Sequence, residues 1–532
     1  MSSDRESVSR RRFLTRAAML AGGVSIGLVG LQAPVVQAAP AVQAVQQPAR
    51  TELRAPTLLQ QTSSITAALS ERLLILDPAN HYSISATGVL RHIFDPLVDV
   101  TSDSKFLPAL AESWENPDPL TWRFKLRQGV TFHDGTPFDS SSAVYTIKRV
   151  ATDKTLLKNS TFFDITSVEA EGQYGVVIRS AHPFGSMLGQ LSALGMLPPS
   201  AAGSEDAFFQ NPIGTGPFRF NGWTRGETIS LAANPSYWKS GTPQIQSATF
   251  RFIPEISTRA AGLQSGEIDI IDRIPADLVP TLQGAAGVTV LAQPAIETQQ
   301  WIFQLQRAPT NDVNFRKAIS RGIDRETIIR DFHLGYAQAA LCPIPPGLVG
   351  WTDLGAKPYD PDAARSFLQA SGVSNPTIDF VLAKGIYPKQ LEIAQAVQAM
   401  LGDVGINVNV RELEVAAARE LRSAGDYHMW YSGWAHLPHD ADWYYSQWYT
   451  TAGASSLSRF SDPAIEQLVI EARSTDNAVR QAKYEQLERT IWEQETAIWP
   501  YNSTAVYGVR DRVSGFEGRT DYMIFVKDAA VG

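Results

Sequence analysis

The sequence predicts a mixed α/β protein made of several lobes. Its 532 residues are more than a single hydrophobic core usually organises. With 44% hydrophobic, 10% aromatic and 19% charged residues, the chain has the composition of a globular protein and not of a disordered one. Segments with the period of strands and segments with the period of helices follow one another without strict alternation. This order argues against one doubly wound sheet and for several α/β lobes.

The first clear strand and helix lie between residues 121 and 150. Apolar residues alternate with polar ones over 121–126, which is the period of a half-buried strand. Asp139 then has the position of an N-cap. The inward face of the helix that follows is expected to hold Val144, Ile147 and Val150.

Similar patterns predict three further elements in the second half of the chain. Leu391, Ala394, Val397 and Leu401 recur at helical spacing, and Gly405 ends that segment. Apolar residues alternate over 406–410, which predicts a strand. Apolar residues within 484–491 predict another amphipathic helix before the proline at position 500.

The N-terminus resembles a twin-arginine export signal. Three arginines at 10–12 precede Phe13 and Leu14, and the apolar run over 17–31 has 15 residues, fewer than the ~20 that span a bilayer. Small residues at 36–38 fit a cleavage site, and no cysteine follows the run. We therefore expect a signal peptide over 1–38 and a flexible tether over 39–62. The protein should work outside the cytoplasm, in the periplasm or an equivalent space, without a lipid anchor.

Charge and cysteine content exclude several classes of site and partner. The formal net charge is −8, and the first 38 residues carry +3, so the remainder carries −11. A nucleic-acid partner is therefore not expected. Cys342 is the only cysteine, so neither an intramolecular disulfide nor a multi-cysteine zinc site can form.

Five groups of residues occur in an order that resembles the family 5 bacterial extracellular solute-binding proteins, the peptide/nickel-type receptors of ABC transporters. The resemblance runs from about residue 70 to about residue 500. The groups are LDPA at 76–79; FLPALAESW at 106–114 with FKLRQGVTFHDGTP at 124–137; PIGTGPF at 212–218; NFRKAI at 314–319 with IDR at 323–325; and YDPDAAR at 359–365.

The resemblance implies a fold like that of the periplasmic binding proteins. Two lobes and an inserted domain would make three domains that close over an interdomain cleft. The expected boundaries are 63–95, 206–300 and 491–532 for domain I, 96–205 for domain II and 301–490 for domain III.

The resemblance also implies a function. The chain would be the extracytoplasmic substrate-binding component of an ABC importer. It would capture an oligopeptide or a similar extended solute by lobe closure and deliver it to the membrane permease. We expect no catalysis, no cofactor, no metal and a monomeric protein.

Aromatic residues are concentrated between Tyr427 and Tyr449, where nine of 23 residues are aromatic. At the 10% of the whole chain, about two would be expected. Large rings with polar edges suit a cleft that holds a ligand by stacking, and we expect roughly half of the nine to face such a cleft and the others to form core.

The resemblance places Gly433, Trp434 and Ala435 along the ligand. In peptide receptors of the family, an acidic residue follows this segment and pairs with the α-amino group of the ligand; here that position holds Leu437. Either Asp440 takes over this role, or the receptor does not bind a free N-terminus. Helix capping before Trp443 is the alternative role for Asp440 and Asp442.

Position alone adds a few residues to the candidate ligand contacts. The full set is Gly433, Trp434, Ala435, Tyr431, Asp440, Asp442, Trp443, Trp301, Tyr501 and Asn502.

Three other functions are weighed against the capture of a peptide. An oligosaccharide receptor of the same fold would use neutral hydrogen bonds and stacking. A receptor for a chelated metal of the nickel type could use His436 and His439, but two histidines without a third ligand are weak evidence. An extracytoplasmic hydrolase would need Asp440 and Asp442 as an acid/base pair, yet residues two apart point in divergent directions on a helix or strand.

Overall fold

The computed structural model describes residues 63–454 and 458–532. The predicted signal peptide and tether, at 1–62, lie outside the described residues. The first described strand, β1, spans Ser64–Leu69, directly after residue 63, where domain I is predicted to begin. Within the described ranges, no helix combines the length and the apolar character that crossing a membrane requires.

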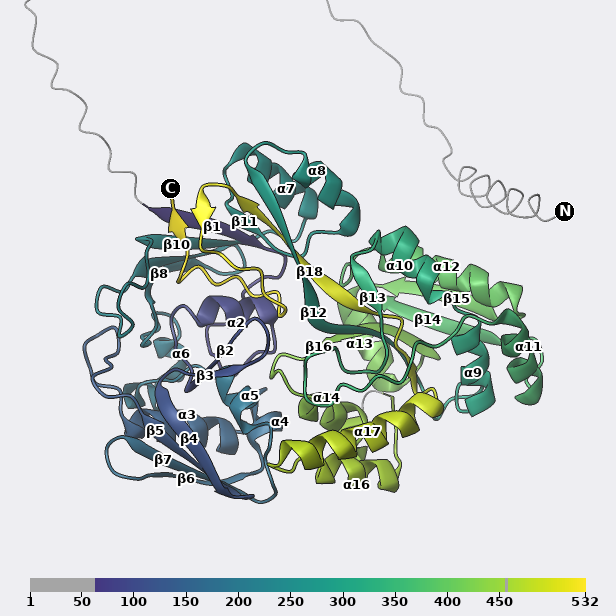
Figure 1. Cartoon of the computed structure of the whole chain (residues 1–532), viewed down its shortest axis with the longest axis horizontal. Coiled ribbons are helices and arrows are strands. Elements are labelled where there is room, and N and C mark those ends of the chain that lie inside the picture. The colour runs from purple at the N-terminus through teal and green to yellow at the C-terminus, as the bar shows by residue number, and fades with distance from the viewer. Residues whose placement is uncertain (1–62, 455–457) are drawn as a thin grey trace, which may run out of the picture. The chain divides into compact units, whose positions relative to one another are not determined.

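A twelve-stranded mixed sheet organises most of the chain (Figure 1). Two short strands lie off the main path, β13 (Ala337–Ala339) beside β18 and β17 (Ala497–Ile498) beside β12. The other strands, in spatial order, are β15 (Asn407–Leu413), β14 (Thr377–Ala383), β16 (Met429–Ala435), β12 (Val288–Phe303), β18 (Tyr501–Arg510), β11 (Ile270–Ile271), β1, β10 (Ser247–Phe252), β9 (Thr228–Ala233) and β8 (Phe218–Thr224).

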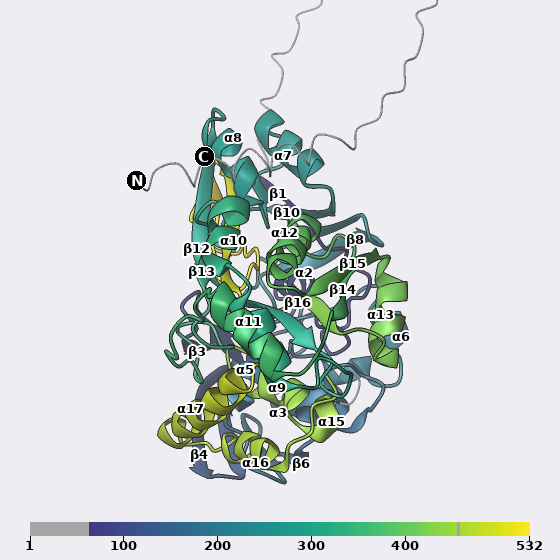
Figure 2. The same ribbon diagram turned by 90° about the vertical axis from the view of Figure 1, so that its right-hand side faces the viewer.

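The long strands β12 and β18 connect the two halves of this sheet. The first part of β12 pairs with β18 from Val288 to Pro294, and its second part pairs with β16 from Glu297 to Phe303. Figure 1 shows this pair of strands between the β1 and β10 side and the β14 to β16 side, and Figure 2 shows β12 along one edge of the molecule in the turned view. Any change in the angle between the two halves of the sheet therefore requires these two strands to bend or twist.

A four-stranded antiparallel sheet forms a separate layer, and it confirms the first predicted elements. Its order is β4 (Ala111–Asp118), β5 (Thr121–Leu126), β7 (Gly175–Ser180) and β6 (Ile165–Ala170). The predicted strand is β5, and the predicted helix is α3 (Ser140–Thr152). The Asp139 carboxylate accepts a hydrogen bond from the Ser141 amide, as an N-cap does. Ile147 and Val150 are buried, and Val144 packs against the same core.

The elements predicted in the second half are also confirmed. The 391–401 pattern lies in α12 (Gln390–Asp403), the 406–410 alternation in β15, and the 484–491 pattern in α17 (Asn477–Glu493). Gly405 has φ +94°, a left-handed conformation that ends the helix segment at little cost for glycine. Leu391 and Val410 are half-buried, whereas Ile393 is fully buried.

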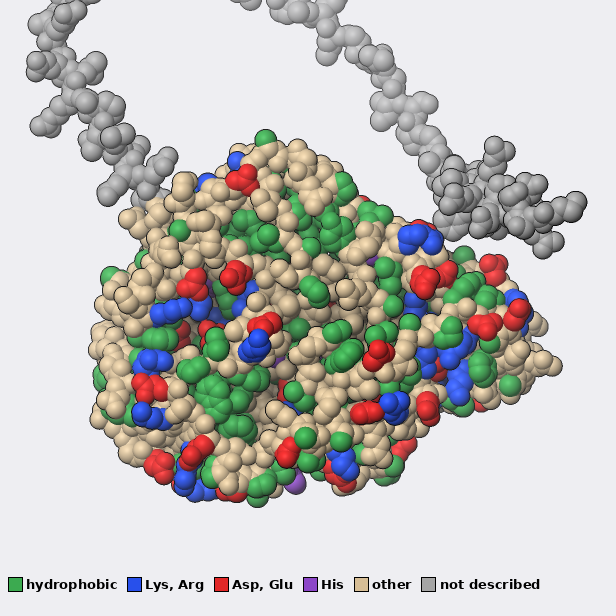
Figure 3. Space-filling model, viewed as in Figure 1, with side chains coloured by type: hydrophobic (Ala, Val, Ile, Leu, Met, Phe, Trp, Pro, Cys, Tyr) green, Lys and Arg blue, Asp and Glu red, His purple; other side chains and the backbone are tan. Residues whose placement is uncertain are grey.

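The remaining elements cover the sheets or connect them. Two small hairpins are β2 (Val98–Val100) with β3 (Phe106–Pro108), and β19 (Val513–Ser514) with β20 (Ala530–Val531). The other helices are α2 (Ile84–Leu90), α4 (Asn159–Phe162), α5 (Met187–Ser192), α6 (Glu205–Phe208), α7 (Ile256–Ser265), α8 (Val279–Gln283), α9 (Val313–Arg321), α10 (Arg325–His333), α11 (Pro361–Ala370), α13 (Val415–Ala424), α14 (Asp442–Trp448), α15 (Thr451–Ala454) and α16 (Pro463–Glu471). On the face seen in Figure 3, acidic and basic side chains are interspersed.

One buried carboxyl in α17 makes the stability of the fold depend on pH. Glu488 is fully buried, and its Oε1 accepts a hydrogen bond of 2.5 Å from the hydroxyl of Tyr445. Burial raises the pKa of Glu488 to about 8, well above its ordinary value of 4.5. Between these two pH values the folded protein keeps a proton that the unfolded chain has lost. The free energy of unfolding contributed by this group therefore falls as pH rises from 4.5 to 8.

We expect Glu488→Gln to remove this dependence, because an amide stays neutral at every pH in that range. Urea unfolding at pH 5 and at pH 8 measures the effect: the wild type should lose more stability than the variant between the two conditions. Glu493→Gln, on the exposed side of the same helix, is the control and should behave as the wild type does. Equal pH dependence in wild type and Glu488→Gln would show that Glu488 is ionised in the fold.

Candidate ligand-binding cavity

A cavity of about 600 Å³ lies where β12 and β18 connect the halves of the large sheet. Strands β1, β10 and β11 are parallel, and residues that follow each of them line the cavity, as do residues 385–389 after β14. Ligands of open α/β sheets bind at the carboxyl ends of strands in this way. The volume of the cavity is within the ~300–1,000 Å³ typical of small-molecule sites.

Aromatic side chains from distant parts of the chain form much of the wall. Their flat faces offer stacking surfaces, and the hydroxyl groups of the five tyrosines can donate or accept hydrogen bonds. They are Tyr82, Phe332, Tyr336, Tyr387, Tyr501 and Tyr522.

Tyr387 closes one side of the cavity against β16. Its hydroxyl accepts a hydrogen bond of 2.7 Å from the Gly433 amide and donates one of 3.2 Å to the Gly433 carbonyl. A Cβ on Gly433 would lie 2.6 Å from Nε2 of Gln299, so any side chain there would displace a cavity-lining group. Glycine at this position thus keeps the cavity open.

Glu297 enters the cavity because β12 is irregular at this point. Pro294 pairs with Thr504 and Thr298 pairs with Asn502, so three residues of β12 face one of β18. Proline cannot donate to the ladder, and bulges of this kind redirect side chains. The Glu297 side chain is nevertheless only 8% exposed. Its Oε1 accepts hydrogen bonds from Gln299 (3.2 Å) and Ser503 (3.0 Å).

Arg273 is the cation nearest to this carboxylate. One of its Nη atoms lies 3.6 Å from Oε2 of Glu297, and its guanidinium stacks over the Tyr522 ring at 4.1 Å from the centroid. Although burial disfavours the charge, Glu297 and other acidic neighbours outweigh it and raise the pKa of Arg273 above its ordinary value. Arg273 is therefore a permanent positive charge in the wall.

Three cavity residues other than glycine have left-handed backbone conformations, namely Arg273 (φ 49°), Lys389 (φ 55°) and Tyr522 (φ 61°). Such residues cost about 1–3 kcal/mol each and are found most often at ligand clamps and active sites. Lys389 also forms an ion pair of 2.7 Å with Asp277, which joins the loop after β14 to the segment after β11.

Two buried atoms of the cavity wall that can accept a hydrogen bond have no hydrogen-bond partner in the described chain. They are Oε1 of Gln299 and Nε2 of His333. Burial lowers the pKa of His333 to about 4, so its ring is neutral at pH 7 and can offer an acceptor. Buried polar groups are almost always paired, which makes these two atoms candidates for ligand contact.

The predicted contact residues fall into several groups. Gly433, Ala435 and Tyr501 line the cavity. Tyr431 lies behind them, with its hydroxyl 3.3 Å from that of Tyr501. Trp301 is fully buried, and its ring centroid lies 5.6 Å from that of Tyr431.

Three other predicted residues, Asn502, Trp434 and Trp443, do not line the cavity. Asn502 is buried, and its Oδ1 accepts a hydrogen bond of 2.8 Å from Thr298. Trp434 packs on Trp443, with ring centroids 4.7 Å apart. Trp443 in turn stacks on Tyr82, a cavity residue, at 4.8 Å. These indoles support the wall from behind.

Asp440 and Asp442 are engaged in ion pairs outside the cavity. Asp440 is buried and lies 2.5 Å from Nη2 of Arg480. It also accepts a hydrogen bond of 2.9 Å from the Asp442 amide at the start of α14. Asp442 accepts a hydrogen bond of 2.6 Å from Ser186 and lies 3.6 Å from Arg473.

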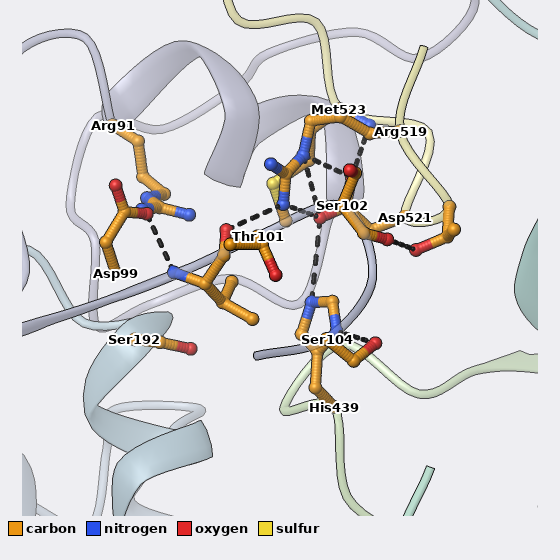
Figure 4. A network of polar contacts seen from close by, with 12 residues as sticks. Arg91, Asp99, Thr101, Ser102, Ser104, Ser192, His439, Arg519, Asp521 and Met523 are labelled. Carbon is orange, nitrogen blue, oxygen red and sulfur yellow. Dashed lines mark hydrogen bonds and ion pairs between the residues drawn. The ribbon is translucent and has the colours of Figure 1, made fainter. Parts of the chain in front are cut away.

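His436 and His439 are both buried, and they have separate surroundings. Burial lowers the pKa of His436 to about 3. Nδ1 of His439 lies 2.8 Å from Oγ of Ser104, and its Nε2 lies 3.6 Å from Asp521 in the polar network of Figure 4. Within the described residues, no group of three or more His, Cys, Asp and Glu side chains is placed to hold a metal ion.

Sequence reasoning missed the charged cavity residues Glu297 and Arg273, together with Tyr387 and His333. A proline followed three residues later by an acid, within a strand-like run, was the available signal for Glu297. Nothing comparable marks Tyr387 or His333, because they lie on a loop and at a helix end far from β12 in sequence.

Comparison with known proteins identifies the family. Residues 105–456, two thirds of the chain, match the model for the middle part of the bacterial extracellular solute-binding proteins, family 5. The chain belongs to this family. Proteins of the family are substrate-binding components of ABC transporters that work outside the cytoplasm and are not enzymes. The resemblance, the fold class and the general function inferred from the sequence are thereby confirmed.

Three similar proteins illustrate the range of the family. The glutathione-binding protein GsiB of Pectobacterium atrosepticum is 27% identical, over 87% of this chain and 93% of its own length. The periplasmic binding protein AgaA of A. tumefaciens R10, solved with agropinic acid, is 26% identical with a TM-score of 0.77, covering 88% of this chain and 99% of its own. DppA of Helicobacter pylori, solved with the peptide STSA, is 23% identical with a TM-score of 0.77, covering 89% and 99%, and supports the fold alone.

Proposed function

We propose that this receptor captures a short peptide or a peptide-like solute in the cavity beside β12, β16 and β18 and delivers it to the permease of an ABC importer. The observation that carries the proposal is the cavity itself, which combines six aromatic rings with the charged pair of Glu297 and Arg273. Its volume of about 600 Å³ suits a ligand of a few residues better than a long chain. GsiB, whose name gives glutathione as its ligand, supports the same class.

Capture by closure follows from the way the cavity is built. Tyr387 and Gly433 come from the β14 to β16 half of the sheet, whereas Arg273 and Ile274 come from the β1 and β11 half. A ligand touching both halves stabilises the closed arrangement, and the permease can recognise that state. The ion pair of Lys389 with Asp277 crosses the same gap and adds to the closed form.

The alternative functions have less support from the described residues. For a hydrolase, Asp440 and Asp442 would have to act as free acids, yet each is held by an arginine. For a metal-chelate receptor, His436 and His439 would have to share a ligand, yet their ring nitrogens have different surroundings. An oligosaccharide would leave the charged pair in the cavity without a partner.

The export route, the lack of a lipid anchor and the monomeric state are inferred from the sequence. We propose that the twin-arginine pathway exports the folded protein, that no lipid anchors it, and that it acts as a monomer. The three-domain division given above is part of the same proposal.

A thermal-shift screen tests the ligand class, since a ligand that binds only the folded state raises the melting temperature. Dipeptides to tetrapeptides, oligosaccharides and nickel–histidine complexes should be compared on the protein as isolated, together with any solute that native mass spectrometry finds retained. We expect a peptide-like solute to give the largest rise. A larger rise with a sugar or a nickel complex would contradict the proposed ligand class.

Tyr387→Ala locates the site, because it removes a ring of the wall and both hydrogen bonds to Gly433. We expect the dissociation constant of the best solute to increase about tenfold or more, as for a truncated aromatic hot spot. Tyr359→Ala, at an exposed tyrosine outside the cavity, is the matched control and should leave the constant unchanged. Equal affinity in Tyr387→Ala and the wild type would place the solute elsewhere.

A further inference from the structure

The cavity offers an acid that the sequence pattern does not predict. Leu437, at the position where the resemblance expects the amine-binding acid, is buried in an apolar cluster. Asp440 is bound to Arg480 and does not line the cavity. Among the described residues that line it, the carboxylates are those of Glu71 and Glu297. Glu71 is exposed, whereas Glu297 is buried at the centre of the sheet.

Glu297 has neighbours that suit an ammonium group. Because a carboxylate only accepts hydrogen bonds, the amide nitrogen of Gln299 must face Oε1 of Glu297, at 3.2 Å. Oε1 of Gln299 is thereby left as a buried acceptor without a partner. Two acceptors side by side match a group that carries three N–H donors.

Arg273 has unused donors beside this acceptor pair. It forms an ion pair with Glu297 and stacks on Tyr522, and the negative charges of Asp272 and Glu71 also act on it. Its side chain makes no hydrogen bond to any of the described residues. The 3.6 Å separation from Glu297 exceeds a hydrogen-bond distance. Stacking fixes the plane of the guanidinium, so its edge is available for a carboxylate.

The short distance between the two charges restricts the ligand. An ammonium on Glu297 and a carboxylate on Arg273 have to be close neighbours in the bound molecule. In an α-amino acid both groups are attached to one carbon atom. In an ordinary linear peptide the terminal charges are separated by at least one trans peptide unit, about 3.8 Å between Cα atoms.

We propose that Glu297 and Gln299 bind the ammonium group, and Arg273 the carboxylate, of a free α-amino-acid head on the solute. The head belongs to an amino-acid derivative or to a peptide linked through a side-chain carboxyl. This assignment rests on the proposed function, because it uses the same cavity and names the group that the cavity recognises. Glu297 of β12 then takes the role of the acid that the resemblance expects at position 437, where this chain has Leu437.

Two isomeric dipeptides test the assignment by titration calorimetry. γ-Glutamylglycine carries the ammonium and a carboxylate on one carbon, whereas α-glutamylglycine has the same atoms and charges with its ammonium next to a peptide bond. We expect the γ isomer to bind about tenfold or more tightly than the α isomer. Equal binding, or preference for the α isomer, would overturn the proposal.

Two variants test which residue binds the ammonium group of the solute and which binds its carboxylate. Glu297→Gln, which keeps the shape of the side chain, should weaken γ-glutamylglycine about thirtyfold or more, as expected for a charged partner lost from a buried pair. Arg273→Met should abolish the preference for the γ isomer. Glu169→Gln and Arg179→Met make the same changes in an exposed ion pair of β6 and β7 and should bind as the wild type does. Unliganded melting temperatures show whether each variant is folded.

The outcomes separate this inference from the proposed function. Undiminished γ-isomer binding by folded Glu297→Gln would overturn the assignment of the acid. If neither isomer binds while another peptide-like solute raises the melting temperature, the proposed function stands and the α-amino-acid head is wrong. If no peptide-like solute binds at all, the proposed function fails as well.

Discussion

Replacing Asp440 by alanine is expected to lower the free energy of unfolding by about 3–5 kcal/mol, because it leaves Arg480 charged and buried without its carboxylate. The two side chains are only 5% and 2% exposed and lie 2.5 Å apart. An arginine guanidinium keeps its proton at neutral pH even when it is buried, so Arg480 stays charged after Asp440 is removed. Urea unfolding of the unliganded protein measures the loss.

Asp426→Ala is the matched control for this change. Asp426 also lies 2.5 Å from an arginine, Arg307, but their side chains are 60% and 33% exposed, and an exposed pair is worth about 1 kcal/mol or less. The comparison also decides between two roles of Asp440 that sequence alone left open. Unchanged stability with a large loss of solute affinity would show that Asp440 contacts the ligand.

Gly189→Ala is expected to destabilise the protein by about 1–3 kcal/mol through overpacking. A Cβ at this position of α5 would lie 2.0 Å from the carbonyl oxygen of Pro438, a backbone atom that cannot give way alone. Helix α5 would have to move away from the segment between β16 and α14. The hydrogen bond from Ser186 to Asp442 and that from the Gly185 amide to the Arg473 carbonyl would then be lost.

The same substitution should weaken solute binding about tenfold if 1.4 kcal/mol of the strain falls on the closed arrangement. Calorimetry and urea unfolding together give both effects. Gly402→Ala is the control, since a Cβ there meets nothing within 4 Å and alanine favours the helix α12 by about 0.5–1 kcal/mol. A Gly189→Ala variant as stable as the wild type would mean that α5 and Pro438 are not in contact in solution.

The local elements could be predicted from sequence because each follows from a period or a cap. The strand at 121–126 and the Asp139 cap depend on neighbouring residues only, and both are present as predicted. The twelve-stranded order could not be derived in this way. Its central strands, β12 and β18, are about 200 residues apart, and their pairing depends on contacts that no local pattern reports.

The site was predictable in part for the same reason. Gly433 and Ala435 were placed by the family pattern, and they line the cavity. The dense aromatic window could not be divided by composition into wall and core: Trp434 and Trp443 lie behind the wall because strand alternation and the turn into α14 direct them there. Glu297 faces the cavity because of the bulge in β12. The bulge changes which residues of the strand face each side, and the sequence does not show how many extra residues it contains.

Small-angle scattering tests the central claim most directly, namely that the two halves of the sheet close over a solute held between them. A saturating concentration of a solute identified by the thermal-shift screen should reduce the radius of gyration of the wild type. At a concentration near the wild-type dissociation constant, the solute should reduce the radius of gyration of Tyr387→Ala much less than that of the wild type. A radius of gyration that stays the same when calorimetry shows the wild type to be saturated would contradict the account.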